Sequence, residues 1–463
     1  MEQRNLIMAI VLSVSILLGF QIFVEAPRIE QERAALEAQK AKEASQTLQP
    51  AQPGVPGTAT PPAVTAPGVP GAAPPTGATA PVAGQPAIAP KIAREKVLSA
   101  FPRVKIATDR VIGSIRLKGA LIDDLTLLNY RQTIKKDSPN IVILSPLDTE
   151  NPYYAQFGWV SQTAGITVPD ADTVWTADRD TLSVGSPVTL RWTNPEGIEF
   201  SQVVSLDKNF MFSVRQQVKN GSSNSVTLNP YGLISLTGTP ETSGFWILHE
   251  GMTGAFDGTL LEESYSSLQD EDDGVIAPDG QSNWIGITAK YFATALVPDQ
   301  KTENKGRWVH NAPRGAKEKY QADYLASATV LAPGQTGEYA TKLFAGAKEV
   351  RLLDSYRDNL GLPVFDKLVD FGWFYYLTKP IFYAIEYFNR ILGNFGLAIL
   401  LLTVLIKIAF FPLANKSYRS MSRLKKLQPK MVEIRDRYKD DRQRQNQAMM
   451  ELYKKEGANP MSG

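Results

Sequence analysis

The sequence predicts a membrane protein of the α+β class, in which two transmembrane helices flank a large all-β domain and a helical hairpin follows the second helix. Three observations lead to this prediction. Two apolar runs, at residues 6–24 and 391–413, are long enough to cross a bilayer. Short stretches of alternating apolar and polar residues fill much of the sequence between them. After the second run, apolar residues recur at a spacing of three and four.

The composition of the 463 residues limits the possible functions. A net charge of +2 argues against a nucleic-acid-binding protein, so we expect no DNA partner. The absence of cysteine excludes disulfides, thiol catalysis and cysteine metal sites. His249 and His310 are the only histidines that a zinc site or a catalytic triad could use. We therefore expect no metal and no other cofactor.

The N-terminal apolar run, LIMAIVLSVSILLGFQIFV, predicts a transmembrane anchor over residues 1–25. A cleaved signal peptide is the alternative, because Val24-Glu25-Ala26 resembles a cleavage site. Pro27 follows directly and should obstruct cleavage, and the run is longer than a signal core of roughly 7–15 residues. An uncleaved anchor is therefore the preferred interpretation.

Residues 26–96 have the composition of a tether on the outer side of the membrane. The segment begins with charged, alanine-rich sequence that we expect to be partly helical, and residues 49–90 are dominated by proline, alanine and glycine. Such a composition cannot bury a hydrophobic core and is typical of an extended spacer. A binding motif within the spacer is the less favoured alternative.

Residues 97–350 predict an all-β domain. Alternating stretches such as NIVILSP (140–146), SPVTLRWTN (186–194) and FMFSVRQQV (210–218) are separated by turn residues such as Asn220-Gly221. Roughly 250 residues are ample for one β-sandwich core. The sequence therefore predicts a sandwich or a related all-β fold.

Residues 351–380 predict an amphipathic helix at the membrane–water boundary. The tryptophan, tyrosine and phenylalanine residues of this stretch favour that boundary, and residues 362–377 can form a helix that lies flat on it. A buried helix of a soluble domain is the alternative. The candidate interfacial residues are Phe365, Phe371, Trp373 and Phe374.

Residues 381–414 predict the second transmembrane helix, which contains Lys407 within its apolar core. A central lysine costs roughly 2.5–3.5 kcal/mol on insertion scales. Because Leu413 is six residues further on, about 9 Å along a helix, the lysine side chain could reach the cytoplasmic headgroups. Alternatively, it faces a water-filled cavity together with Thr403, which lies four residues earlier on the same helix face. The residues alone leave both interpretations open.

Residues 415–463 predict a cytoplasmic helical hairpin. An apolar seam passes through positions 424, 427, 431, 434 and 438. A second stripe, at positions 445, 449 and 452, can pack against this seam from a returning helix. Pro429 predicts a kink or a fresh helix start. The basic residues that we single out are Arg423, Lys425, Lys426 and Lys430. Their excess should keep this segment cytoplasmic and leave residues 25 to about 375 outside, in the periplasm if the cell has two membranes.

Enzyme motifs are mostly absent, and we expect a protein that is not an enzyme. His249-Glu250 is a candidate general acid–base pair, although such a pair more often satisfies a structural hydrogen bond. Tryptophan side chains are candidates for stacking on a sugar, although core positions are the commoner case. These tryptophans are Trp246, Trp284 and Trp308.

Several stretches together resemble the YidC membrane-protein insertases of Gram-negative bacteria. They are QRNLIMAIVLSVSILLGFQ (3–21), DNLGLPVFDKLVDFGWFYYLTKPIFY (358–383), GNFGLAILLLTVLIKIAFFPLANKSYRSMSRLKKLQPKM (393–431) and MMELYKKEGANPMSG (449–463), and the resemblance is highly specific from residue 359 onward. FWILHEGMTGAFDG (245–258) and WIGITAKYFATALVPD (284–299) are similar to parts of that family's periplasmic domain. The resemblance covers the chain outside the proline-rich tether.

The resemblance implies an inner-membrane insertase and chaperone that acts alone or with the secretion channel. In that family a hydrophilic groove is open to the cytoplasm and to lipid, and a positive residue of the second span attracts acidic residues of the incoming protein. Lys407 occupies that position, where the family commonly has arginine, so a bidentate contact is in doubt. The implied partners are nascent membrane proteins, the ribosome, secretion translocon components and anionic lipids, and the implied outer fold is a β-supersandwich.

Two other functions stay open at this point. The chain could be a membrane-anchored periplasmic carbohydrate-binding or carbohydrate-processing protein, or a purely structural envelope anchor in which Lys407 snorkels to the headgroups. Members of the resembled family have further spans after the Asn459-Pro460 stretch. The resemblance therefore also leads us to expect a C-terminally truncated piece that lacks part of the groove wall.

Overall fold

The computed structural model describes residues 79–82, 93–242, 248–312, 316–372, 374–439 and 441–456. The side chains of Ser420, Arg423 and Leu424 lie outside this description. The predicted anchor over residues 1–25 also lies outside it, as does the predicted tether apart from residues 79–82 and 93–96.

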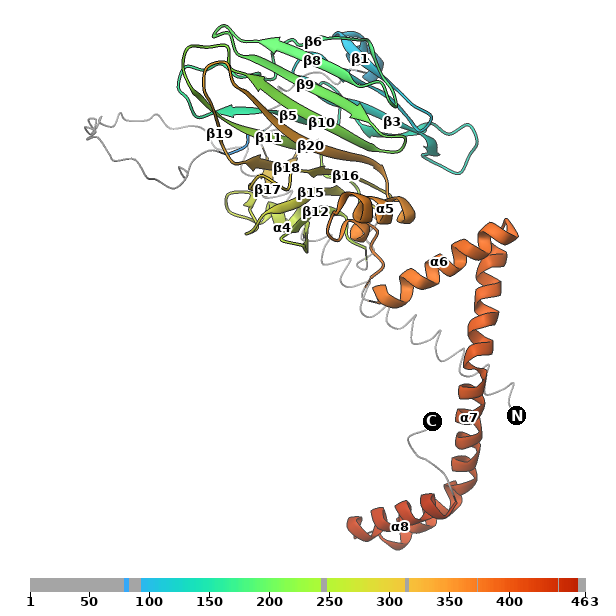
Figure 1. Cartoon of the computed structure of the whole chain (residues 1–463). Helices are drawn as coiled ribbons and strands as arrows, with labels where there is room; N and C mark the ends of the chain where they lie inside the picture. Colours follow the sequence, from blue (N-terminus) through green and yellow to red (C-terminus); the bar gives the residue numbers. More distant parts are fainter. Residues whose placement is uncertain are drawn as a thin grey trace, which may run out of the picture. The chain divides into compact units, whose positions relative to one another are not determined.

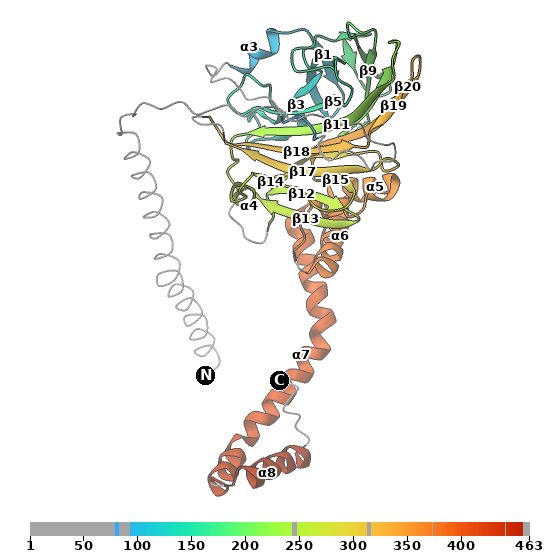
Figure 2. The ribbon, with the colours of Figure 1, turned by 90° about the vertical axis from the view of Figure 1, so that its left-hand side faces the viewer.

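The predicted all-β domain is present in the described part of the chain as two large, mainly antiparallel sheets (Figures 1 and 2). One has the strand order β14-β17-β18-β11-β5-β3-β2-β1-β7, with β19 paired to β11 and β4 to β3. Its strands are β1 (Arg103–Ala107), β2 (Val111–Arg116), β3 (Leu121–Arg131), β4 (Asn140–Leu144), β5 (Tyr153–Ser161), β7 (Thr181–Leu182), β11 (Val226–Thr237), β14 (Val275–Ile276), β17 (Asn304–Asn311), β18 (Lys319–Ala326) and β19 (Thr329–Leu331). We call it the 11-stranded sheet.

The second, 9-stranded sheet has the order β13-β12-β15-β16-β20-β10-β9-β8-β6. Its strands are β6 (Thr176–Ala177), β8 (Val188–Thr193), β9 (Glu199–Leu206), β10 (Met211–Lys219), β12 (Gly251–Phe256), β13 (Thr259–Ser264), β15 (Ser282–Thr288), β16 (Phe292–Val297) and β20 (Thr336–Ala347). Neighbouring strands in this sheet are antiparallel, whereas β1 and β7 of the other sheet run parallel. The helix α3 (Arg94–Ser99) precedes the first strand, and α4 (Tyr265–Gln269) lies between β13 and β14.

Strand β10 shows how the alternation in the sequence places a strand. Val214, Gln216 and Val218 are buried, whereas Arg215 and Lys219 between and beyond them are exposed. This period of two is the signature of a strand with one face on a core. Because β10 pairs along its whole length with both β9 and β20, it occupies an interior position of its sheet.

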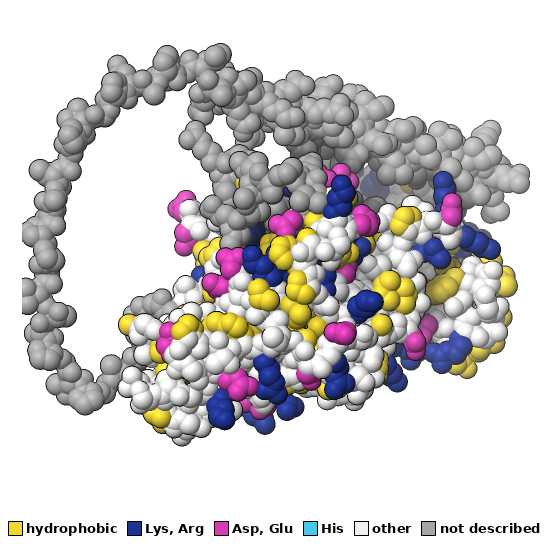
Figure 3. Space-filling model, turned by 90° about the horizontal axis from the view of Figure 1, so that it is seen from above, with side chains coloured by type: hydrophobic (Ala, Val, Ile, Leu, Met, Phe, Trp, Pro, Cys, Tyr) yellow, Lys and Arg dark blue, Asp and Glu magenta, His cyan; other side chains and the backbone are white. Residues whose placement is uncertain are grey.

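A contiguous hydrophobic core combines side chains of both sheets, including Trp284 of β15 and Trp308 of β17. A smaller cluster is separate from it and consists of Ala80, Leu121, Tyr154, Tyr231 and Leu233. The surface of the domain differs from both. Seen from above, it mixes basic and acidic side chains with scattered apolar ones, as expected for a face in water (Figure 3).

The amphipathic helix predicted over residues 362–377 is not continuous, and this prediction was wrong. Helix α5 (Val350–Leu360) ends at Gly361, which adopts a left-handed conformation, and Pro363 follows shortly after it. The short 3-10 helix η2 (Phe365–Leu368) comes next. The following α-helix, α6 (Tyr375–Leu392), begins after Gly372, whose φ is 70°. These backbone breaks divide the segment in spite of its amphipathic pattern.

The second predicted span begins later than expected. The sequence placed its start at residue 381 and its apolar core from residue 391, but residues up to Leu392 belong to α6. Gly393 closes α6 in a left-handed conformation, and the Asn394 side chain accepts a hydrogen bond from the Leu397 amide to open α7 (Phe395–Arg437). A C-cap glycine and an N-cap asparagine in adjacent positions therefore set the boundary.

The predicted helical hairpin is formed by the end of α7 and by α8 (Arg442–Lys455). α7 continues through Pro429, so the fresh helix start that this proline suggested does not occur. Among the described seam residues, Leu427 is buried and Met431, Ile434 and Tyr438 are half-buried. An ion pair of 2.9 Å between Lys430 Nζ and Glu456 Oε1 joins the two arms.

Replacing Phe365 should destabilise the β domain, because this side chain of η2 is fully buried against the rings of Trp284, Phe344 and Tyr356. We expect Phe365→Ala to lower the free energy of unfolding by about 3–5 kcal/mol. Phe374→Ala is the control, since that ring is 71% exposed and its loss should cost under about 0.5 kcal/mol. Denaturant unfolding followed by β-sheet circular dichroism measures both, and equal effects would contradict the packing described.

Candidate functional site

The part of the chain that the structure describes contains one helix that is long and apolar enough to cross a membrane, Phe395–Arg419 within α7. Only 6% of its most apolar stretch is buried inside the protein. Its leucine, isoleucine and phenylalanine side chains are therefore free to face lipid. This exposure distinguishes it from a core helix of a soluble domain, which would be covered by other elements.

Lys407 lies at the midpoint of that helix. It is twelve residues after Phe395 and twelve before Arg419, which corresponds to about 18 Å of helix on either side. Its side chain is exposed and has no hydrogen bond or ion pair with any other described residue. Thr403, also exposed, lies one turn earlier and donates its hydroxyl to the Ile399 carbonyl oxygen at 2.8 Å. The two residues predicted as groove-facing thus share one helix face. Of the two, only Lys407 has a polar group that makes no hydrogen bond or ion pair with another described residue.

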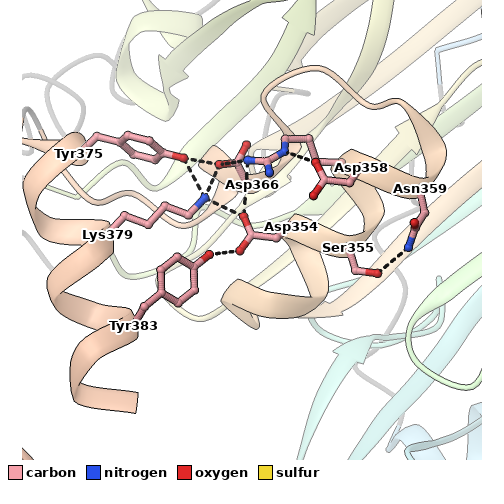
Figure 4. Close-up of polar contacts among 9 residues, drawn as sticks. Asp354, Ser355, Asp358, Asn359, Asp366, Tyr375, Lys379 and Tyr383 are labelled. Atoms are coloured by element: carbon pink, nitrogen blue, oxygen red, sulfur yellow. Dashed lines mark hydrogen bonds and ion pairs between the residues drawn. The ribbon is translucent and has the colours of Figure 1, made fainter. Parts of the chain in front are cut away.

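A buried polar cluster joins α6 to the end of the β domain (Figure 4). Lys379 of α6 is 7% exposed, and its ammonium donates to Asp354 Oδ1 at 2.7 Å, Asp366 Oδ2 at 2.6 Å and the Tyr375 hydroxyl at 2.8 Å. These three acceptors satisfy all three donors of a lysine. Tyr375 also donates to Asp366, and Tyr383 donates to Asp354. We call these five residues the α6 clasp.

The geometry of the α6 clasp keeps its charges ionised. Burial alone would raise the pKa of Asp366, but hydrogen bonds from Lys379 and Tyr375 and the nearby charge of Arg357 outweigh it and lower this pKa. Burial alone would lower the pKa of Lys379, but its carboxylate partners raise it instead. Arg357 adds a further ion pair, with its Nη1 atom 3.0 Å from Asp366 Oδ2. Together with Arg357, the clasp therefore sets two cations against two carboxylates and acts as a structural charge cluster.

Sequence reasoning missed the α6 clasp. Its signal was present, because Tyr375, Lys379 and Tyr383 are spaced by four and must share one face of a helix. The partners Asp354 and Asp366 come from α5 and η2, and no local pattern relates them to α6. Only the folded chain shows that five polar groups meet there.

The predicted interfacial residues do not share one surface. Phe365 lies in the core of the β domain and is fully buried, so it cannot meet a membrane, and this prediction was wrong. Phe371 is half-buried between the rings of Tyr375 and Phe382. Phe374 is 71% exposed at the start of α6, and Trp373 lies outside the described residues. A membrane-facing role stays a prediction for Phe371 and Phe374.

The basic residues of the hairpin also differ from one another. Lys425 and Lys426 are exposed on α7, whereas Lys430 is paired with Glu456 across the hairpin. The side chain of Arg423 lies outside the description. Among the candidates whose side chains are described, Lys425 and Lys426 are therefore the two with charge to offer a partner.

Structural roles are found for Trp284, Trp308 and His249, three of the residues that suggested sugar binding or acid–base catalysis. Trp284 and Trp308 are fully buried in the core, and Trp246 lies outside the described residues. His249 Nε2 is 2.8 Å from the Met252 carbonyl oxygen, so its ring is committed to the backbone. The described residues contain no group of acidic, histidine or cysteine side chains that could hold a metal ion.

A cleft of about 670 Å³ lies beside β10, β16 and β20. Polar side chains such as Arg215, Gln300 and Lys342 line it together with aliphatic ones, and no aromatic ring is among its described lining residues. Ligand pockets for small molecules usually contain aromatic side chains. The cleft therefore does not favour the carbohydrate alternative.

Comparison with known proteins agrees with this division into a β domain and a membrane segment. A family described as the YidC periplasmic domain matches residues 103–384, and one described as 60Kd inner membrane protein matches residues 387–463. A membrane protein insertase YidC from Methylorubrum extorquens is 44% identical over 100% of this chain and 74% of its own length. Those of Bradyrhizobium diazoefficiens and Rickettsia bellii are 42% and 37% identical, over 100% and 99% of this chain and 74% and 75% of their own lengths.

A solved galactose mutarotase-like protein from Lactobacillus casei aligns with 52% of this chain and 99% of its own, at 12% identity and a TM-score of 0.35. No function is carried over from that likeness.

Removal of the clasp lysine should release α6 from the β domain. Lys379→Met leaves the buried Asp366 and the half-buried Asp354 without their main counter-charge, which costs about 3 kcal/mol and should accelerate amide exchange in α6 about a hundredfold. Hydrogen–deuterium exchange of the membrane-embedded protein measures this. Arg351→Met is the matched control, because it removes the exposed ion pair between Arg351 and Glu386 of the same two helices and should change little. Equal exchange in the two variants would refute a structural role of the clasp.

The clasp should also have a defined pH dependence. The lowered pKa of Asp366 means that its contribution to stability is fully present above the ordinary value of 3.8 and is lost as the pH falls through the lowered value. Protection of the α6 amides, corrected for intrinsic exchange, should therefore stay constant from pH 8 to pH 5 and fall only below about pH 4. A loss of protection between pH 7 and pH 6 would point to a different group.

Proposed function

The chain belongs to the YidC family of membrane protein insertases, and we propose that Lys407 of α7 is the cation through which it handles acidic segments of its substrates. It is an inner-membrane protein with a periplasmic domain, it acts on nascent membrane proteins, and it is not an enzyme. The observation that carries the proposal is the position of Lys407 within an apolar helix, without a partner among the described residues.

The membrane topology that we propose has two crossings. The apolar run at residues 6–24 forms the first, and Phe395–Arg419 of α7 forms the second. The excess of lysine and arginine after the second crossing keeps the hairpin in the cytoplasm, and the β domain then lies in the periplasm. This multi-pass arrangement places Lys407 within the bilayer.

Lys407 is easier to accommodate beside water than in lipid. At the centre of a membrane an unpaired lysine costs roughly 2.5–3.5 kcal/mol, and such residues usually face a partner or a wet cavity. In this proposal α7 contributes one wall of a hydrophilic groove that is open to the cytoplasm, and the hydroxyl of Thr403 adds to the polarity of that wall. Water in the groove hydrates the ammonium until an acidic substrate group replaces it.

The groove lowers the barrier for a short outer segment of a substrate. A hydrated path through part of the bilayer shortens the apolar layer that the segment must cross. The ammonium of Lys407 transiently pairs with the carboxylates of the segment as it crosses. The apolar span of the substrate then moves sideways into lipid, where hydrophobic transfer supplies the driving force. The reaction therefore consists of binding and partition, without a chemical step.

Exposed side chains of the hairpin and of α6 suggest further partners. Exposed Lys425 and Lys426 suit phosphate-rich partners, namely anionic lipid headgroups or ribosomal RNA, and we propose contact with a translating ribosome. The secretion translocon is a further proposed partner of the complete membrane assembly. The exposed rings of Phe374 and Tyr376 suit the membrane–water boundary at the start of α6.

The decisive test changes the charge at position 407 and the charge of the substrate together. In cells whose own gene carries the variant, we expect Lys407→Glu to slow insertion of a small single-span protein with an acidic outer tail by about tenfold, which corresponds to about 1.4 kcal/mol of lost attraction. Lys407→Arg keeps the charge and should retain insertion. Pulse-labelling followed by external protease measures the fraction of tails that reach the outside.

The substrate itself provides the control. The same protein with its tail carboxylates replaced by amides should insert at one rate in cells with the native lysine, with Lys407→Gln and with Lys407→Glu, because it carries no charge for position 407 to attract or repel. If Lys407→Glu leaves the acidic tail unaffected, the lysine only snorkels to the headgroups, and the groove proposal fails while family membership stands.

A further inference from the structure

Four residues of the proline-rich tether are described in the structure, and they lie against the β domain. Residues 79–82 have the sequence Thr-Ala-Pro-Val. Ala80 is 2% exposed, although Val82, two residues later, is 48% exposed. An alanine buried to this extent within such a tether requires a binding surface, because the segment cannot form a core of its own.

The apolar part of this surface is the smaller hydrophobic cluster of the β domain. Ala80 packs with Leu121 of β3, Tyr154 of β5, and Tyr231 and Leu233 of β11. These strands are neighbours in the 11-stranded sheet. The cluster is separate from the main core. The tether therefore packs on apolar side chains that do not belong to that core.

The polar part of the surface binds the backbone of the tether. Arg307 Nη2 donates to the carbonyl oxygen of Ala80 at 2.6 Å, and Gln321 Nε2 donates to that of Pro81 at 3.0 Å. Proline has no amide hydrogen, and the residue before it favours an extended backbone that leaves its carbonyl free. Side-chain donors are therefore the appropriate partners for an Ala-Pro segment.

A buried carboxylate fixes both donors. Asp323 is 1% exposed and accepts from Arg307 Nε at 3.0 Å and from Gln321 Nε2 at 2.6 Å. Arg307 of β17 lies directly opposite Asp323 of β18 in the register, and Gln321 precedes Asp323 by two residues, so all three side chains share one face of the sheet. β17, β18 and β11 lie side by side in Figure 2.

We infer that this face of the 11-stranded sheet is a binding site for an extended Ala-Pro segment, and that residues 79–82 occupy it in the native protein. We call it the tether dock and define it by Arg307, Gln321 and Asp323 with the apolar cluster under Ala80. The apolar cluster around Ala80 accommodates a small side chain. Arg307 and Gln321 bind backbone carbonyl oxygens of the segment and not its other side chains. Docking leaves residues 26–78 of the predicted tether between the predicted anchor and the dock.

The cysteine-free sequence makes the tether dock directly measurable. A second Thr-Ala-Pro occurs at residues 65–67, so Ala66→Cys gives a thiol in the same local sequence as Ala80→Cys. In the full chain under native conditions, we expect a maleimide to modify Ala80→Cys at least about tenfold more slowly than Ala66→Cys, because reaction requires the docked segment to open. Equal rates, with unchanged unfolding of the β domain, would overturn the inference.

A second pair of variants tests release of the segment without altering the β domain. Pro81→Gly in the Ala80→Cys protein makes the docked backbone more flexible and should raise its rate at least about threefold toward that of Ala66→Cys. Pro67→Gly in the Ala66→Cys protein is the matched control and should leave its rate unchanged. If both glycines have the same effect, protection at position 80 reflects local chemistry, and the tether dock does not exist.

Discussion

The attachment of α6 to the β domain centres on one buried ammonium, that of Lys379. The ion pairs with Asp354 and Asp366 connect α6 to α5 and η2, and η2 is itself anchored by Phe365 in the core. Removing a charge from water is expensive unless all its hydrogen bonds are made, and here all three are made. Because hydrogen bonds are directional, the contact fixes the orientation of α6 on α5 and η2, which a purely apolar contact would not do.

Two lysines of the membrane-proximal segment have opposite surroundings. We assign a structural role to the one that is paired within the fold and propose a substrate-binding role for the other. Lys379 has its counter-charges within the fold, so it has nothing to offer a substrate. Lys407 has none among the described residues, although it lies in the more apolar environment. In our proposal, the charge of Lys407 is met first by water and then by the carboxylates of a membrane protein in transit.

The sequence predicted the elements whose pattern is local. Alternation in stretches such as residues 210–218 predicted the β domain, and the seam of Leu427, Met431, Ile434 and Tyr438 predicted the hairpin. It failed where backbone conformation overrides side-chain pattern, as at Gly361 and Gly372, which break the helix expected over residues 362–377. It also missed the α6 clasp, because the aspartates come from other elements. The apolar pattern singled out Lys407 but left snorkelling and a wet cavity equally open, and the family resemblance then favoured the functional interpretation.

The tether dock shows the same limit in a segment that has no pattern at all. Proline and alanine between residues 49 and 90 predict a spacer, and composition cannot distinguish the four residues that bind from those that only connect. The distinction lies in the partner, where buried Asp323 holds two donors over an apolar pocket. Because the dock holds the segment before the domain and the clasp holds the helix after it, both connections of the β domain leave from fixed points.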